Sequence, residues 1–227
     1  LTDNRSPEVL IAEAVEMAKD ADYVIFVGGL NKSDHQDNES TDRLQITLPY
    51  DQEDVILALA EVAKNLVVVN ISGSPVAMPW ADSADAIVQG WYGGTESGNA
   101  LADVLTGKVN PSGRLPFSVP FKYEDGPIKT EAQYPGIKTE DDEFWQTHYS
   151  EGVYVGYRWY ATQEIPVQFP FGHGLSYTTF EYSNAKAAKA SMTAAGTLKV
   201  SVDVENTGSV DGAEVVQLYI ADPEASI

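Results

Sequence analysis

Residues 22–29, DYVIFVGG, and the polar segment after them, residues 30–48, LNKSDHQDNESTDRLQITL, decide how the rest of the chain is interpreted. Residues 23–27 are aromatic or branched at Cβ and Gly28-Gly29 ends the run, which is the pattern of a strand buried on both faces. Ligands of open α/β sheets bind beyond the carboxyl ends of the strands, so the segment 30–48, here called the acidic loop, is where we expect chemistry. Within ten residues this loop holds Asp34, His35, Asp37, Glu39, Asp42 and Arg43.

The net charge of the chain disfavours negatively charged binding partners. The chain has 34 acidic and 14 basic residues among 227, a net charge of −20. Nucleic acid and anionic membrane surfaces would be repelled by this charge, whereas a neutral ligand such as a sugar would be indifferent to it. The chain has no cysteine, which excludes disulfides and thiolate chemistry. The three histidines, His35, His148 and His173, show no metal-ligand spacing, so we expect no metal site and no cofactor.

Strands and helices alternate through residue 107. Ser6-Pro7 begins an amphipathic helix, with an expected apolar stripe of Val9, Leu10, Ala14, Met17 and Ala18. Two more helices are predicted over residues 50–64 and 95–105, the latter closed by Gly107, and two more strands over 66–71 and 84–90. This order predicts an α/β fold with a mostly parallel sheet flanked by helices, an α/β sandwich.

The pattern changes after residue 113. Residues 114–120 are extended between prolines, and the long insertion 121–150 has neither helical nor strand periodicity, a feature that is often functional. Residues 153–160 predict an aromatic strand. Beyond residue 179, the segments 197–204 and 214–220 alternate apolar and polar residues around a turn at 206–208, as in an antiparallel sandwich.

A complete sandwich has roughly seven strands, and only about three are indicated here. We therefore expect two domains, an α/β sandwich over residues 1–172 and a truncated antiparallel β-sandwich over residues 173–227.

Two common site motifs are not matched. The glycine turn before the helix at 95–105 fits neither G-x-G-x-x-G nor G-x-x-x-x-G-K-[ST]. Ser72 and Ser74 follow a strand without the G-x-S-x-G pattern of a nucleophile elbow.

The grouping Glu39-x-x-Asp42-Arg43 is more informative, although a carboxylate-rich loop is commonly only a solvated surface. We expect Arg43 to pair with Asp42 and support the loop, leaving Glu39 free to project. A carboxyl that donates a proton needs a raised pKa, and an ion pair with Arg43 would lower the pKa of Glu39 instead.

Several motifs in this order resemble the glycoside hydrolase family 3 enzymes, in their C-terminal α/β-sandwich domain and the start of their fibronectin type III-like domain. The matching segments cover almost the whole chain: VGGLN (27–31), ESTDRLQITLP (39–49), NLVVVNISGSPVAMPW (65–80), AIVQGWYGGTESGNALADVLTGKVNPSGRLPFSVP (86–120), YSEGVYVGYRWY (149–160), FPFGHGLSYTTFEY (169–182) and VENTGSVDGAEVVQLYIADPEAS (204–226).

The resemblance implies a retaining, exo-acting β-glycosidase such as a β-glucosidase. In this family an aspartate on a preceding barrel domain is the nucleophile, and the acid/base glutamate lies in a motif like E-G-x-D-R, which corresponds to residues 39–43 here. Glu39 would then protonate the leaving oxygen and later deprotonate water. Ser40 stands where glycine is usual, and a changed backbone at this position could re-aim the loop. Asp37 is the nearest substitute for Glu39 as the acid/base.

The resemblance also implies partners and a location. The substrate would be a β-linked oligosaccharide or glycoside, the barrel domain would complete the site, and the 227 residues alone would be inactive. A polysaccharide-degrading role suggests a periplasmic or extracellular location, by analogy.

A second hypothesis is a non-catalytic assembly or carbohydrate-contact module that uses the insertion 121–150. Phe144, Trp145 and Tyr149 could stack on a sugar ring and bind substrate, lie at a homodimer interface, or pack against the sheet as core residues.

Overall fold

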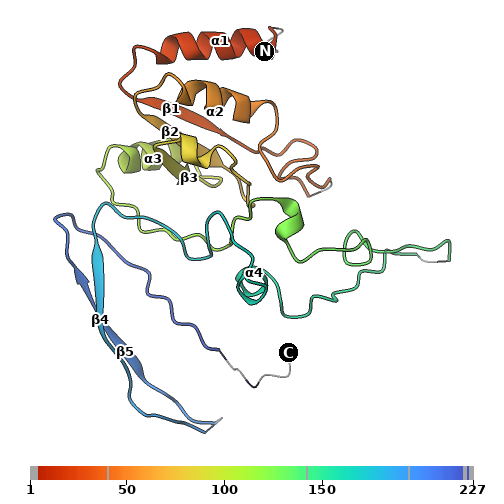
Figure 1. The fold of residues 1–227 in the computed structure, drawn as a ribbon, viewed down its shortest axis with the longest axis vertical. Coiled ribbons are helices and arrows are strands. Elements are labelled where there is room, and N and C mark those ends of the chain that lie inside the picture. The colour runs from red at the N-terminus through yellow and green to blue at the C-terminus, as the bar shows by residue number, and fades with distance from the viewer. Residues whose placement is uncertain (1–4, 40, 142, 194, 222–223, 225–227) are drawn as a thin grey trace. The chain divides into compact units, whose positions relative to one another are not determined.

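The computed structural model describes residues 5–39, 41–141, 143–193, 195–221 and 224 (Figure 1). The described chain divides into two compact units. The first is formed by residues up to Ser97 together with 116–171, and the second by residues 98–115 together with the segment from Gly172 onward. No helix in these described ranges is long and apolar enough to cross a membrane.

The first unit is built on a parallel three-stranded sheet in the order β1-β2-β3. The strands are β1 (Val24–Gly29), β2 (Leu66–Ile71) and β3 (Ala86–Gln89). Val24 lies opposite Leu66 and Val67 opposite Ala86, so all three strands end at the same edge. The predicted α/β fold with a parallel sheet is therefore confirmed.

Two helices cover this sheet. Helix α2 (Gln52–Ala60) packs against β1 and β2, and helix α1 (Pro7–Ala18) packs against α2 (Figure 1). Pro7 takes the first helical position of α1, where a missing N–H costs nothing. Tyr50 and Asp51 have φ angles of 62° and 56°, outside the right-handed helical region, so α2 begins at Gln52, later than the sequence predicts.

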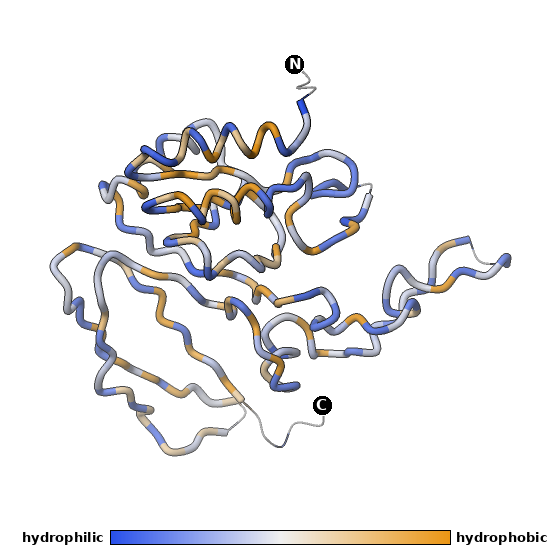
Figure 2. The backbone as a smooth tube through the Cα atoms, turned by 45° about the horizontal axis from the view of Figure 1, so that its top comes forward, coloured by the Kyte–Doolittle hydropathy of each residue, from blue (hydrophilic) through white to orange (hydrophobic). Residues whose placement is uncertain are grey.

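The core of this unit lies between the helices and the sheet. Ile56 and Leu59 of α2 meet Leu66 and Val68 of β2, and Trp80 beyond the next turn is fully buried beside them. In Figure 2 the hydrophobic stretches of this unit gather in the sheet and α2. Each such side chain contributes roughly 1.5–3 kcal/mol by its removal from water, so this cluster dominates the stability of the unit.

Burial on both faces of β1 was a wrong prediction. Ile25 and Val27 are 49% and 58% exposed, because α2 covers only the face of β1 that carries Val24 and Phe26. The expected stripe of α1 is also partly wrong. Ala14 and Ala18 pack against the core, while Met17 is 81% exposed.

Residues 116–171 complete the first unit with little regular structure. Val119 pairs with Phe169, and within the insertion Ile137 pairs with Gln146. The predicted strand at 153–160 is wrong. Gly156 has a φ of 57°, the helix α4 (Tyr157–Thr162) follows it, and the Trp159 indole N–H donates to the carbonyl of Asp125 at 2.8 Å. The remaining short elements are the 3-10 helices η1 (Ala81–Ser83) and η2 (Tyr123–Asp125).

The second unit contains helix α3 (Ser97–Leu105) apart from its first residue, and an antiparallel pair of strands, β4 (Phe180–Ala187) and β5 (Val200–Asn206). Gly107 has a φ of 75° after the end of α3, as the sequence predicts. The expected strand at 214–220 is wrong, because β4 and β5 pair only with each other in the described residues.

Candidate active site

Three loops meet at the carboxyl edge of the parallel sheet: the acidic loop after β1, the turn 72–75 after β2, and the segment 90–93 after β3. The backbone joins them directly. The N–H of Leu30 donates to the carbonyl of Ile71, and that of Gly90 donates to the carbonyl of Asn70, both at 2.8 Å. Gly29 is required at this junction, because its φ is 139° and a Cβ would lie 2.0 Å from the Ile71 oxygen.

The carboxylate of Asp37 connects the three loops. Its Oδ1 accepts a hydrogen bond from the Ser74 hydroxyl at 2.6 Å. Its Oδ2 accepts from the backbone N–H of Gly73 at 2.7 Å and from the Tyr92 hydroxyl at 2.8 Å. One side chain of the acidic loop is thus bonded to the segments that follow both β2 and β3. We call Asp37, Gly73, Ser74 and Tyr92 the Asp37 cluster.

Arg43 joins the same loops from a second position. Its Nη1 donates to the Ser74 hydroxyl at 3.1 Å and to the Pro75 carbonyl at 2.7 Å, and its Nη2 donates to the Ile46 carbonyl at 2.9 Å. The predicted ion pair between Arg43 and Asp42 is wrong, because the Ser74 hydroxyl and the carbonyls of Pro75 and Ile46 accept the hydrogen bonds that the guanidinium donates.

These contacts determine the electrostatics of the cluster. Partial burial raises the pKa of Asp37. The hydrogen bonds from Ser74, Gly73 and Tyr92 and the charge of Arg43 together lower this pKa by more than burial raises it, so the net shift is downward. Burial, together with the neighbouring Asp37 carboxylate, raises the pKa of Tyr92 to about 12. Burial lowers the pKa of Arg43 from its ordinary value. At neutral pH the cluster therefore contains an ionised Asp37 and a neutral Tyr92.

A buried polar network supports the turn after β2. The Asn70 side chain donates to Gln89 Oε1 at 2.8 Å and to Ser72 Oγ at 3.0 Å, and Ser72 Oγ donates to the carbonyl of Ser74 at 2.9 Å. Ser72 is fully buried. The two serines therefore shape the turn. The asparagine within an otherwise apolar strand was the sequence signal that could have indicated this network.

Asp42 lies further along the acidic loop than Asp37. Its carbonyl is 3.0 Å from His35 Nδ1. A hydrogen bond to Asp42, with a smaller effect of burial, raises the pKa of Tyr134. Because Tyr134 belongs to the insertion 121–150, this contact brings the insertion against the acidic loop.

Glu39 is exposed and directly precedes Ser40, which lies outside the described residues. No described group forms a hydrogen bond or ion pair with the Glu39 carboxylate, and Arg43 is bonded elsewhere. The carboxyl is therefore available to a ligand, and its acid/base role stays a prediction, as does the effect of Ser40.

The aromatic side chains of the insertion are exposed. Phe144, Trp145 and Tyr149 are 69%, 57% and 79% exposed, which rules out the interpretation that they are core residues. The described structure shows no hydrogen bond between these side chains and Glu39. Neither does it contain a group of three or more histidine and acidic side chains that could hold a metal ion.

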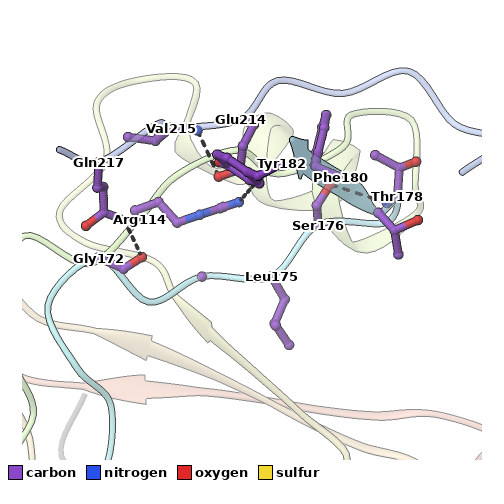
Figure 3. A pocket seen from close by; sticks show the side chains of 12 residues that line it. Arg114, Gly172, Leu175, Ser176, Thr178, Phe180, Tyr182, Glu214, Val215 and Gln217 are labelled. Carbon is purple, nitrogen blue, oxygen red and sulfur yellow. Dashed lines mark hydrogen bonds and ion pairs between the residues drawn. The ribbon is translucent and has the colours of Figure 1, made fainter. Parts of the chain in front are cut away.

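The second unit has an open hollow of about 540 Å³ beside β4 (Figure 3). Its charged lining residues are Arg114 and Glu214, whose side chains are 10% and 14% exposed and pair at 2.8 Å. Arg114 Nη1 also donates to the Gly113 carbonyl at 3.0 Å. Since both charges are neutralised within the protein, this hollow offers no free acid or base, and we assign it a structural role.

The fold and the site define a class of protein: a parallel α/β domain with a polar loop fastened to the carboxyl edge of its sheet, followed by antiparallel strands. The sequence profile of the glycosyl hydrolase family 3 C-terminal domain matches residues 4–177, and the chain belongs to this family.

Similar proteins share this family. The beta-glucosidase BoGH3A of Bacteroides ovatus is 51% identical over 217 residues, which cover 95% of this chain and 28% of that protein. Thermostable beta-glucosidase B of Acetivibrio thermocellus is 43% identical over 97% of this chain and 28% of its own length.

Solved structures agree. A GH3 beta-glucosidase of Bifidobacterium adolescentis matches 98% of this chain and 32% of that chain with a TM-score of 0.81 and 38% identity. A beta-glucosidase of Kluyveromyces marxianus in complex with glucose matches 92% of this chain and 24% of that chain, with a TM-score of 0.75 and 39% identity. The chain thus spans about a quarter to a third of the length of these relatives.

Proposed function

We propose that this chain is part of a retaining, exo-acting β-glucosidase that removes terminal sugars from β-linked oligosaccharides or glycosides. The observation that carries the proposal is the fastened acidic loop, in which Asp37 and Arg43 are bonded to neighbouring turns while Glu39 is exposed and has no hydrogen-bond or ion-pair partner among the described residues. The chain belongs to glycosyl hydrolase family 3, and the similar proteins described above are beta-glucosidases, which supports a β-glucoside as the substrate.

In this proposal Glu39 is the general acid/base. It donates its proton to the glycosidic oxygen as the bond to the anomeric carbon breaks, and a carboxylate of a barrel domain outside this chain attacks that carbon. Glu39 then removes a proton from the water that hydrolyses the glycosyl-enzyme. This reaction involves no metal ion and no change of oxidation state, so Glu39 and the carboxylate of the barrel domain are the only catalytic groups that it requires.

Replacement of the acid in the complete protein tests the assignment. For Glu39→Gln we expect turnover of an unactivated disaccharide to fall by about 10²–10⁴-fold, the usual contribution of general acid–base catalysis. An aryl glucoside with a good leaving group should lose much less in kcat/KM, because its departure needs no proton. Azide should restore turnover of the aryl glucoside and yield a glucosyl azide, since azide attacks the glycosyl-enzyme without a base.

Glu61→Gln is the matched control, because Glu61 is an exposed glutamate at the end of α2 in the same unit. Unchanged disaccharide turnover in Glu39→Gln would refute the catalytic assignment. The same loss in both variants would indicate damage to the fold in place of lost chemistry.

The proposal extends to the parts around the site. Residues 1–172 would be the α/β-sandwich domain, residues 173–227 would belong to a fibronectin type III-like domain, and the protein would act in the periplasm or outside the cell. The paired strands β4 and β5 support the second domain. Cell fractionation of the source organism tests the location, and activity confined to the cytosolic fraction would contradict it.

A second candidate function rests on the exposed aromatic residues of the insertion. Phe144, Trp145 and Tyr149 could contact carbohydrate or form a homodimer interface in a module without catalytic function. Deletion of residues 140–149 from the complete protein should halve the mass measured by light scattering if they hold a dimer, and an unchanged mass excludes the interface. The double variant Phe144→Ala/Trp145→Ala should raise KM for longer oligosaccharides if they bind sugar.

A further inference from the structure

The Asp37 cluster has a bonding pattern that the proposed acid/base chemistry does not use. Both oxygens of Asp37 are occupied by three donors, at 2.6, 2.7 and 2.8 Å, from segments that follow two different strands. Asp37 lies only two residues before Glu39, so whatever holds Asp37 also holds the backbone that presents Glu39.

This arrangement is unsuited to proton donation by Asp37 itself. A carboxyl that accepts three hydrogen bonds is stabilised in its ionised form, because each donor favours the charged oxygen. Protonation of Asp37 would replace an acceptor by a donor in a site where Ser74, Gly73 and Tyr92 already donate. Asp37 is therefore built to remain a carboxylate, whereas no group in the described part of the chain donates a hydrogen bond to the Glu39 carboxyl.

The three groups that donate hydrogen bonds to Asp37 come from two different segments of the chain. The N–H of Gly73 and the hydroxyl of Ser74 belong to the turn after β2, whose shape is set by the buried Ser72 and Asn70. Tyr92 comes from the segment after β3. Contacts to both segments fix the acidic loop in two directions across the edge of the sheet, which one contact could not do.

We propose that Asp37 and Tyr92 are positioning residues that hold the acidic loop at the carboxyl ends of β2 and β3 and thereby aim Glu39 at the glycosidic oxygen. This inference rests on the proposed function. Proton transfer depends steeply on geometry, and a displacement of about 1 Å can cost about 10²-fold in rate. Release of one donor should therefore weaken the acid step far more than substrate binding.

The test uses the ratio of two kcat/KM values measured on the complete protein, one for an unactivated disaccharide and one for an aryl glucoside whose leaving group needs no proton. A loss of folded enzyme lowers both values equally and leaves this ratio unchanged, whereas a misplaced acid lowers the ratio. We expect the ratio to fall about tenfold in Tyr92→Phe and up to about 10²-fold in Asp37→Asn, with little change in KM.

Two further variants separate positioning from general damage. Ser74→Ala should lower the ratio, and Ser74→Thr, which keeps the hydroxyl, should restore it. Tyr23→Phe is the matched control, because Tyr23 is 70% exposed and lies before β1, away from the cluster. Its ratio should equal that of the unaltered protein.

The outcomes distinguish this inference from the proposed function. If Glu39→Gln lowers the ratio while Asp37→Asn and Tyr92→Phe leave it unchanged, the positioning roles are refuted and the acid/base assignment stands. If Asp37→Asn lowers the ratio and Glu39→Gln does not, Asp37 is itself the acid and the inference is overturned. Azide should also restore aryl glucoside turnover in Asp37→Asn if the substitution weakens the step in which Glu39 removes a proton from water.

Discussion

At the scale of single residues, Asp37 affects stability as well as the position of the acidic loop. Its pKa is lowered in the folded state, so its carboxylate stabilises the fold above its ordinary pKa of 3.8, and this contribution is lost as the pH falls through the lower folded value. We expect Asp37→Asn to destabilise the protein at neutral pH and to have a shrinking effect below about pH 4.

Urea unfolding followed by tryptophan fluorescence at several pH values measures this difference. Asp82→Asn, which alters an exposed carboxylate, is the control. A destabilisation by Asp37→Asn that stayed constant down to about pH 3 would show that the charge of Asp37 is not what matters.

Gly29 gives a second prediction at this scale. Its φ of 139° and the 2.0 Å approach of the Ile71 oxygen leave no room for a side chain, so Gly29→Ala should destabilise the protein by about 1–3 kcal/mol or more. Gly94→Ala is the matched control, because nothing lies within 4 Å of the position that its Cβ would take. Thermal unfolding of both variants decides, and equal midpoints would contradict the steric argument.

The sequence allowed part of the candidate site to be predicted. Glu39 and Arg43 stand out by their local spacing, and the structure leaves Glu39 without a described partner. The partners of Asp37 and Arg43 could not be predicted, because Ser74 lies 37 and 31 residues further along the chain and Tyr92 lies 55 residues beyond Asp37. Such contacts depend on the order of the strands in the sheet, which local patterns do not specify.

At the scale of elements, the strands β2 and β3 and the helices α1 to α3 follow from periodicity and turn residues. The failures have tertiary causes. Residues 153–160 have strand-forming side chains, yet Gly156 turns the chain into a helix whose Trp159 bonds to Asp125. Residues 214–220 alternate correctly but lack a neighbouring strand in the described chain, and alternation cannot report whether a partner is present.

Helix α2 offers a test of where the core lies. Ile56 is fully buried against the sheet, whereas its neighbour Leu57 is 44% exposed. Ile56→Ala should cost about 2–5 kcal/mol, the usual effect of a large-to-small change in a packed core, and Leu57→Ala should cost less than about 1 kcal/mol. Chemical denaturation of both variants measures the difference, and similar costs would mean that α2 packs on another face.

At the scale of the whole molecule, the 227-residue chain spans only part of the length of its relatives, and this gives the last prediction. Retaining hydrolysis needs two carboxyl groups about 5–5.5 Å apart, one as nucleophile and one as acid/base. In the proposed function only the second belongs to this chain. The polypeptide 1–227 should therefore fail to hydrolyse even an aryl glucoside, although its first unit has a core of its own and should unfold cooperatively. Circular dichroism and a turnover assay on the same sample test both statements. Turnover by this polypeptide that is abolished by Glu39→Gln would mean that the nucleophile also lies within these residues, whereas turnover that survives the substitution would point to a different site.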